Sequence, residues 1–289
     1  MSENNSDLSN LRDEIDQIDD ALHDLLMRRA DVVDQVKDAK ADSGGAIFRP
    51  GREAEILRRL ADRHSGTLPR DVIIRMWREL VSAFVSLQGP FSVSVWDTGD
   101  VGCWDLARDH FGTRSEMTRL KSTRGVLHAV AEGTATAGVL PFPQEGEADP
   151  WWPALDVTTD KRLQICARLP FGSIGNGKGV RSGALVVTAN DPEPSGDDHS
   201  FILIEQEESA SRGGLATAFG DAGFDMKFIA GGSSSDALML LAEINGFVTP
   251  DDKRLAACLE NAPGVRSAHV VGAYAVPLGT TEIVGDTNS

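Results

Sequence analysis

The stretch "LRDEIDQIDDALHDLLMRRADVVDQVKDAK", Leu11–Lys40, is the longest helical pattern in this chain of 289 residues. Its apolar residues recur mostly at steps of three and four, as on one face of an α-helix, at Leu11, Ile15, Ile18, Leu22, Leu25, Val33 and Val36. Two cations, Arg29 and Lys40, lie on the same stripe, within ~20° of each other around the helix axis. Burying unpaired charge costs several kcal/mol. The stripe therefore predicts either a small anion between these two side chains or, for each of them, a place at the margin of a core.

Three helices are expected in the N-terminal part of the chain. The first runs over residues 7–41 and ends at Gly44 and Gly45, and the others cover 52–63 and 69–88. A single helix as long as the first is marginal in water without packing, so we expect it to pack against a partner.

Polar residues interrupt the apolar stripes of the two shorter helices as well. Glu53 lies on a stripe with Leu57, Leu60 and His64, and Gln88 extends the stripe formed by Trp77, Val81 and Phe84. Arg52 precedes Glu53 near a helix start, where backbone N–H groups add partial positive charge. Arg12 lies roughly 90° round the first helix from Arg29 and Lys40, so it is poorly aimed at their site.

Composition excludes several classes of function. The net charge of −16 argues against binding nucleic acid or an anionic membrane surface. The three cysteines are widely spaced and signal neither a disulfide framework nor a zinc site, and the six histidines form no metal motif. We expect a cytoplasmic protein, because the N-terminus is too charged for a signal peptide and no apolar run is long enough to span a bilayer.

The rest of the chain predicts two units that mix strands and helices. Residues 90–190 read as a small α/β region with strands in "FSVSVWD", "TAGVLPF", "RLQICARL" and "LVVTA" and a helix in "GVLHAVAEG". After the linker "NDPEPSGDD", residues 198–279 follow the βαββαβ order of ferredoxin-like domains, and 280–289 form a flexible tail. The predicted class is multi-domain, all-α followed by α/β and α+β.

The N-terminal pattern resembles a known family. Leu11–Lys40, followed by "RPGREAEILRRL" and a third helix that ends in "SLQ", is similar to the all-helical class of chorismate mutases over residues 7–88. The resemblance implies an intertwined homodimer, residues 1–89 as the mutase domain, and the rearrangement of chorismate to prephenate with no cofactor and no metal.

The resemblance also implies a role for each polar residue. Arg12, contributed by the partner subunit, and Arg29 bind the substrate carboxylates, while Lys40 and Gln88 hydrogen-bond the ether oxygen. Arg52 adds a positive contact, and Glu53 holds the ring hydroxyl. Two positions depart from the family: Phe84 stands where some relatives have Ser, and Arg49 where others have Asp.

The downstream units resemble prephenate dehydratase and its regulatory ACT domain. "AVAEGTATAGVLPFPQE", Ala129–Glu145, matches the first lobe of the dehydratase, but only about 30 residues link Leu169 to the last unit, too few for a second lobe. Ser182, Gly183 and Ala184 replace its catalytic Thr-Arg-Phe motif, so we expect dehydration to be lost.

The last unit carries a candidate effector site. Its turn "RGGL" resembles the amino-acid-binding turn of ACT domains, which implies a Phe or Tyr effector bound by Arg212, Gly213, Gly214 and Leu215. The second family motif is replaced by Ala230–Ser233, so a relic kept for dimer packing stays an open alternative.

One motif and two other functions complete the predictions. "GSIGNGKG", Gly172–Gly179, has Gly179 where a phosphate-binding loop needs Ser or Thr, so no nucleotide is predicted. The sequence leaves two alternatives to a mutase open: an inactive sensor or scaffold that binds aromatic metabolites, and an isochorismate-pyruvate lyase on the same helical fold.

Overall fold

A computed structural model describes residues 3–41, 45–99, 102–155, 162–172, 183–234 and 237–279. Four features of the sequence predictions lie wholly or partly outside these residues. They are Gly44, Ser182, most of Gly172–Gly179, and the tail 280–289.

The N-terminal part consists of the three predicted helices, α1 (Glu3–Ala41), α2 (Pro50–Asp62) and α3 (Arg70–Gln88). Helix α2 begins earlier than predicted, at Pro50, because a proline lacks the N–H that the first helical turn leaves unused. Helix α3 ends at Gly89, as predicted.

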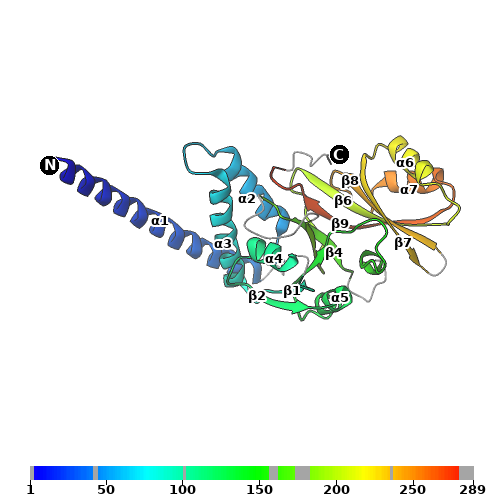
Figure 1. Cartoon of the computed structure of the whole chain (residues 1–289), viewed down its shortest axis with the longest axis horizontal. Helices are drawn as coiled ribbons and strands as arrows, with labels where there is room; N and C mark the ends of the chain where they lie inside the picture. Colours follow the sequence, from blue (N-terminus) through cyan, green and yellow to red (C-terminus); the bar gives the residue numbers. More distant parts are fainter. Residues whose placement is uncertain are drawn as a thin grey trace.

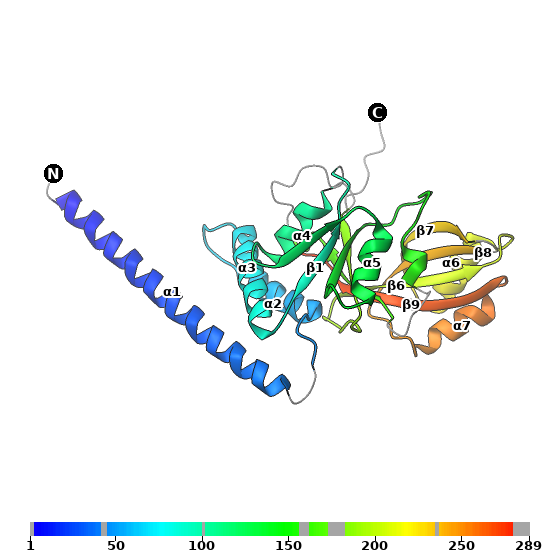
Figure 2. The same cartoon turned by 90° about the horizontal axis from the view of Figure 1, so that it is seen from below.

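Helix α1 extends away from the rest of the chain as a long rod, and only its C-terminal end lies beside α3 (Figures 1 and 2). Its apolar stripe is therefore open to solvent, with 41% to 60% of the side-chain surface exposed at Leu8, Leu11, Ile15, Ile18, Leu22, Leu25 and Val36. Large exposed apolar patches of this kind mark interaction surfaces.

Helices α2 and α3 pack on each other and on the rest of the molecule. Ala54, Leu57 and Ala61 of α2 form a buried cluster with Ile74 of α3 and with residues beyond the helices, Phe171 and Ala275. The helical part therefore shares a core with the downstream part, and only α1 stands apart from it.

The downstream part is built on one nine-stranded sheet in the order β2-β1-β3-β5-β4-β9-β6-β8-β7. Its strands are β1 (Ser92–Trp96), β2 (Glu116–Leu120), β3 (Ala137–Pro141), β4 (Gln164–Leu169), β5 (Ala184–Thr188), β6 (Asp198–Gln206), β7 (Met226–Ser234), β8 (Ala237–Asn245) and β9 (Val265–Ala275). The remaining helices are α4 (Cys103–Phe111), α5 (Thr123–Ala131), the short 3₁₀ turn η1 (Trp152–Leu155), α6 (Arg212–Asp221) and α7 (Lys253–Asn261).

The sheet joins the two predicted downstream units edge to edge. Strand β4 of the first unit pairs in parallel with β9 of the second, where Ile165 lies opposite Gly272. A Cβ at Gly272, whose φ is +143°, would lie 2.2 Å from the carbonyl oxygen of Ile165, so the strands approach this closely only because residue 272 is glycine.

A buried polar cluster crosses this join. The hydroxyl of Tyr274 donates a hydrogen bond to Oε1 of Glu243, and Nη1 of Arg168 lies 3.3 Å from the same oxygen. Nδ1 of His199 lies 3.1 Å from the Tyr274 hydroxyl. Although burial opposes it, the hydrogen bonds and the Arg168 charge together lower the pKa of Glu243.

The last unit has the predicted order, β6-α6-β7-β8-α7-β9, with its strands arranged β9-β6-β8-β7. Three described elements of the preceding unit are absent from the sequence predictions: α4, β2 and the 3₁₀ turn η1. Strand β2 lies at the sheet edge with mostly exposed polar residues, so it lacks the apolar alternation that identifies a strand.

Candidate active site

Lys40 and Gln88 are brought together by the ends of α1 and α3. Nζ of Lys40 donates to Oε1 of Gln88 at 3.3 Å and to the carbonyl oxygen of Ala46 at 3.1 Å. The amide nitrogen of Gln88 donates back to the carbonyl of Phe84, which fixes the amide with its oxygen toward Lys40. An ammonium and an amide, 48 residues apart in sequence, are thus held side by side.

Arg29 lies on α1, before Lys40 in the sequence, and packs against α3. Its guanidinium carbon stacks over the ring of Phe84 at 4.1 Å from the centroid. Nη1 of Arg29 is buried and has no hydrogen-bond acceptor among the described residues. Burial also lowers the pKa of Arg29. A buried guanidinium N–H without an acceptor is costly, and an anionic ligand would satisfy it.

Glu53 is buried on α2 and bound to a cation that the sequence predictions do not contain. Its Oε2 accepts from Nη1 of Arg78 on α3 at 3.0 Å, with 12% and 7% of the two side chains exposed. Burial raises the pKa of Glu53 against the opposing charge of Arg78, and lowers that of Arg78 to about 10. Arg78 lies on the buried face of α3 with Ile74 and Ser82, a position from which the sequence could have identified it.

A small cavity lies beside this ion pair, lined by Phe48, Glu53, Ser82, Val85, Phe91, His110 and Phe111. Nε2 of His110 is buried there without a hydrogen-bond partner among the described residues. Burial and then the charge of Arg78 lower the pKa of His110 well below its ordinary value, so this ring is neutral at pH 7.

Arg52 and Arg12 lie apart from this cluster. Nη1 of Arg52 forms an exposed ion pair with Oε2 of Glu55, one turn along α2, at 2.7 Å. Arg12 is exposed and lies toward the N-terminal end of α1. The structure therefore brings together Arg29, Lys40 and Gln88 through α1 and α3, whereas Arg52 pairs with Glu55 and Glu53 pairs with Arg78.

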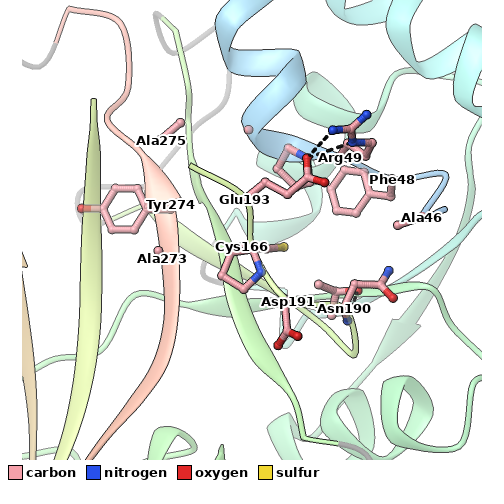
Figure 3. A pocket seen from close by; sticks show the side chains of 14 residues that line it. Ala46, Phe48, Arg49, Cys166, Asn190, Asp191, Glu193, Ala273, Tyr274 and Ala275 are labelled. Atoms are coloured by element: carbon pink, nitrogen blue, oxygen red, sulfur yellow. Dashed lines mark hydrogen bonds and ion pairs between the residues drawn. The ribbon is translucent and has the colours of Figure 1, made fainter. Parts of the chain in front are cut away.

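A pocket opens between the start of α2, the loop before β6 and strand β9 (Figure 3), and its lining includes Ala46, whose carbonyl accepts from Lys40. Nε and Nη2 of Arg49 both contact Oε2 of Glu193 there, at 2.9 and 2.7 Å. Figure 3 shows this pair at one end of the pocket, with the ring of Tyr274 turned away from it. The sequence predictions include neither Glu193 nor this contact, because the partners are 144 residues apart.

The predicted effector turn lies at the start of α6. Nη2 of Arg212 is 2.7 Å from Oε1 of Glu145, whose other oxygen accepts from the backbone N–H of Gly231 at 2.9 Å. Gly213 and Gly214 are exposed, and Leu215 is buried in the core of the last unit. The carboxylate of Glu145, from the preceding unit, is thus already paired with the Arg212 guanidinium of this turn.

No group of His, Cys, Asp and Glu side chains in the described ranges is arranged to hold a metal ion. Of the helices that the structure describes, none is both long and apolar enough to cross a membrane.

Comparison with known proteins identifies the N-terminal part. Residues 11–89 match the family described as Chorismate mutase type II. The chain is 28% identical over 162 residues to a bifunctional chorismate mutase/prephenate dehydratase of Pseudomonas aeruginosa, and 32% identical over 158 residues to one of Neisseria gonorrhoeae. These alignments cover 54% and 55% of this chain but 43% of each relative, so the chain spans less than half of their length.

Solved structures include prephenate dehydratase from Streptococcus mutans, which is 13% identical with a TM-score of 0.47 and covers 65% of this chain and 98% of that one. The match to the family model identifies residues 11–89 as a chorismate mutase domain, of a family of isomerases, and the two relatives named above are bifunctional chorismate mutase/prephenate dehydratases.

Proposed function

We propose that this chain is a chorismate mutase that rearranges chorismate to prephenate in the biosynthesis of phenylalanine and tyrosine. One observation carries the proposal: in a domain of this family, a buried Arg29 N–H lacks an acceptor on the same bundle that holds Lys40 against Gln88. Chorismate supplies the two carboxylates and the ether oxygen that these donors need.

The reaction needs charge stabilisation and no nucleophile. As the ether bond breaks, negative charge grows on its oxygen, and a fixed ammonium at Lys40 stabilises that charge without reorganisation. The amide oxygen of Gln88 accepts from Lys40 and holds it in place. The amide N–H groups of Gln88 do not titrate, so they remain hydrogen-bond donors at every physiological pH. Arg29, stacked on the ring of Phe84, clamps a substrate carboxylate in the folded conformer.

We propose that Arg12 completes the site of a second copy in a homodimer. The support is the open apolar stripe of α1, which includes Leu11, Ile15 and Leu22 and lacks a covering element among the described residues. Pairing two such helices would bury both stripes and place each Arg12 beside the partner subunit.

Arg52 and Glu53 have supporting roles in this proposal. Arg52 would exchange its exposed contact with Glu55 for the substrate, because an exposed ion pair contributes only about 0–1 kcal/mol. Glu53, held by its ion pair with Arg78, would accept a hydrogen bond from the ring hydroxyl of the substrate.

Dehydration is absent from the proposed function. Between the end of β4 at Leu169 and the start of β6 at Asp198 the chain has room for β5 alone among its described elements. Regulation through an ACT-like last unit, with Phe or Tyr as effector at Arg212–Leu215, is proposed as well. An effector carboxylate there would have to displace Glu145 from Arg212.

The decisive experiment follows the absorbance of chorismate with the purified protein. We expect turnover by the wild type, and a fall in kcat/KM of roughly 100-fold or more for Lys40→Ala, as for other groups that stabilise developing charge. Lys37→Ala, an exposed residue of the same helix, is the matched control and should keep full activity. A wild type that leaves chorismate unchanged refutes the proposal, and conversion of isochorismate to pyruvate would replace it by the lyase.

A further inference from the structure

Arg49 is a cation at the edge of the candidate active site to which the proposed mechanism gives no task. It precedes the first residue of α2, and its side chain is 43% exposed. Ala46, whose carbonyl accepts from Lys40, and Arg49 line the same pocket. Burial lowers the pKa of Lys40, the nearby charge of Arg49 lowers it further, and the charge of Glu193 raises it. Arg49 therefore adds positive charge where a dianionic substrate has to bind.

Glu193 neutralises this cation from another part of the chain. It belongs to the segment Asp191–Asp198 that enters β6, and its Oε2 takes both contacts of Arg49 in Figure 3. Asp191, the other acid of the pocket, points away from Arg49 in the same view. Of the two acids of the pocket, Glu193 is thus the one that forms the ion pair with Arg49.

The segment does not need the Glu193 carboxylate to stay in place. Arg58 of α2 donates to the carbonyl and hydroxyl oxygens of Ser195, to the carbonyl of Asp197 and to that of Val276. Close to Glu193 itself, α2 and the segment approach so tightly that a Cβ at Gly51 would lie 2.7 Å from the Glu193 carbonyl oxygen. The backbone is docked by these contacts, so the side chain of Glu193 is available for another role.

We propose that Arg49 is a further substrate-binding residue and that Glu193 is its internal competitor, which a substrate carboxylate displaces. This inference rests on the proposed mutase function. Both partners of the Arg49–Glu193 pair are about half exposed, so the pair is weak and can exchange with a ligand. A guanidinium at this place would strengthen the binding of a dianion, and the Glu193 carboxylate would weaken it by competing for Arg49.

The test measures KM and kcat by absorbance for Glu193→Gln, Arg49→Gln and the double variant, and the dissociation constant of chorismate by calorimetry for the same changes in a Lys40→Ala background, in which turnover is slow. Glu193→Gln should lower Kd and KM roughly threefold to fivefold with kcat unchanged, because one competing charge is removed. Arg49→Gln should raise Kd, and in its background Glu193→Gln should have no effect. Glu205→Gln is the matched control, since Glu205 forms an exposed ion pair with Arg266 on β6 and β9 and should leave all constants unchanged.

The outcomes separate the two proposals. A wild type that binds chorismate without converting it refutes the mutase, and the comparison of dissociation constants still decides the role of Arg49. The inference is overturned if Glu193→Gln leaves Kd unchanged, or if it changes Kd by the same factor when Arg49 is already Gln. It is also overturned if neither the wild type nor Glu193→Gln binds chorismate. Urea unfolding of Glu193→Gln should match the wild type, because Arg58 holds the segment; a large loss of stability overturns the inference as well, since it would show Glu193 to be a structural anchor.

Discussion

The buried pair of Glu53 and Arg78 allows a sharp prediction about stability. Nη1 of Arg78 lies 3.0 Å from Oε2 of Glu53, and both side chains are almost completely removed from solvent. Arg78→Met removes the cation and leaves a buried carboxylate without its charge partner. Breaking such a pair from one side costs about 3–5 kcal/mol, so the free energy of unfolding should fall by that amount at pH 7.

The loss should depend on pH in a defined direction. Burial raises the pKa of Glu53, and in Arg78→Met no cation opposes this shift. Between the ordinary carboxyl pKa of about 4.3 and the raised value, the unfolded chain is ionised and the folded protein is protonated. The free energy of unfolding therefore falls as pH rises through this window and is recovered toward pH 4, by up to about 1.4 kcal/mol per pH unit.

The double variant Glu53→Met, Arg78→Met is the control. It replaces the ion pair by an apolar pair of similar volume, and its stability should equal that of the wild type or exceed it by about 1–4 kcal/mol. Both variants retain His110, whose lowered pKa removes stability at acid pH, so the difference between them isolates Glu53. Urea unfolding followed by tryptophan fluorescence from pH 5 to 8 measures it. A loss below about 1 kcal/mol in Arg78→Met, with no slope in that difference, would refute the reasoning.

Three further outcomes are expected. Gln88→Glu places a carboxyl 3.3 Å from Lys40. A carboxyl donates a hydrogen bond only when it is protonated, so kcat/KM of this variant should fall as pH rises, whereas the wild-type amide keeps its N–H donor. A flat pH profile contradicts this. Equal mixing of Arg12→Ala and Lys40→Ala should restore roughly a quarter of wild-type activity, because half of the dimers are mixed and each has one intact site; no recovery after reassembly contradicts the shared site. Glu145→Ala should tighten phenylalanine binding in calorimetry by removing a competitor from Arg212, and absence of binding in both proteins would count against an effector there.

The helices were predictable because their apolar periodicity is long and regular. The stripe that contains Arg29 and Lys40, and the stripe that ends at Gln88, come from spacing alone, and the structure places these three side chains on neighbouring elements. Spacing says which face is apolar but not what covers it. The stripe of α1, exposed within one chain, shows this limit.

The missed features depend on contacts between distant segments. The pairs Glu53–Arg78, Arg49–Glu193 and Arg212–Glu145 join residues 25, 144 and 67 positions apart, and no local pattern connects such partners. The join of β4 to β9 was invisible for the same reason. Only the close approach at Gly272, set by the finished sheet, shows why that residue is glycine.

The energetic inequality between α1 and the other helices is the strongest argument for a second copy. Helices α2 and α3 bury apolar faces against each other and against Phe171 and Ala275, so their stability is contained within one chain. Helix α1 has 39 residues, yet its stripe meets α3 only near its C-terminal end. Most helical stability in proteins comes from packing an apolar face, and no other described residue of this chain covers the projecting part of α1. In the proposed homodimer, an identical α1 would supply a stripe of the same length and bring Arg12 with it, so one assembly would account for both the exposed stripe and the position of Arg12.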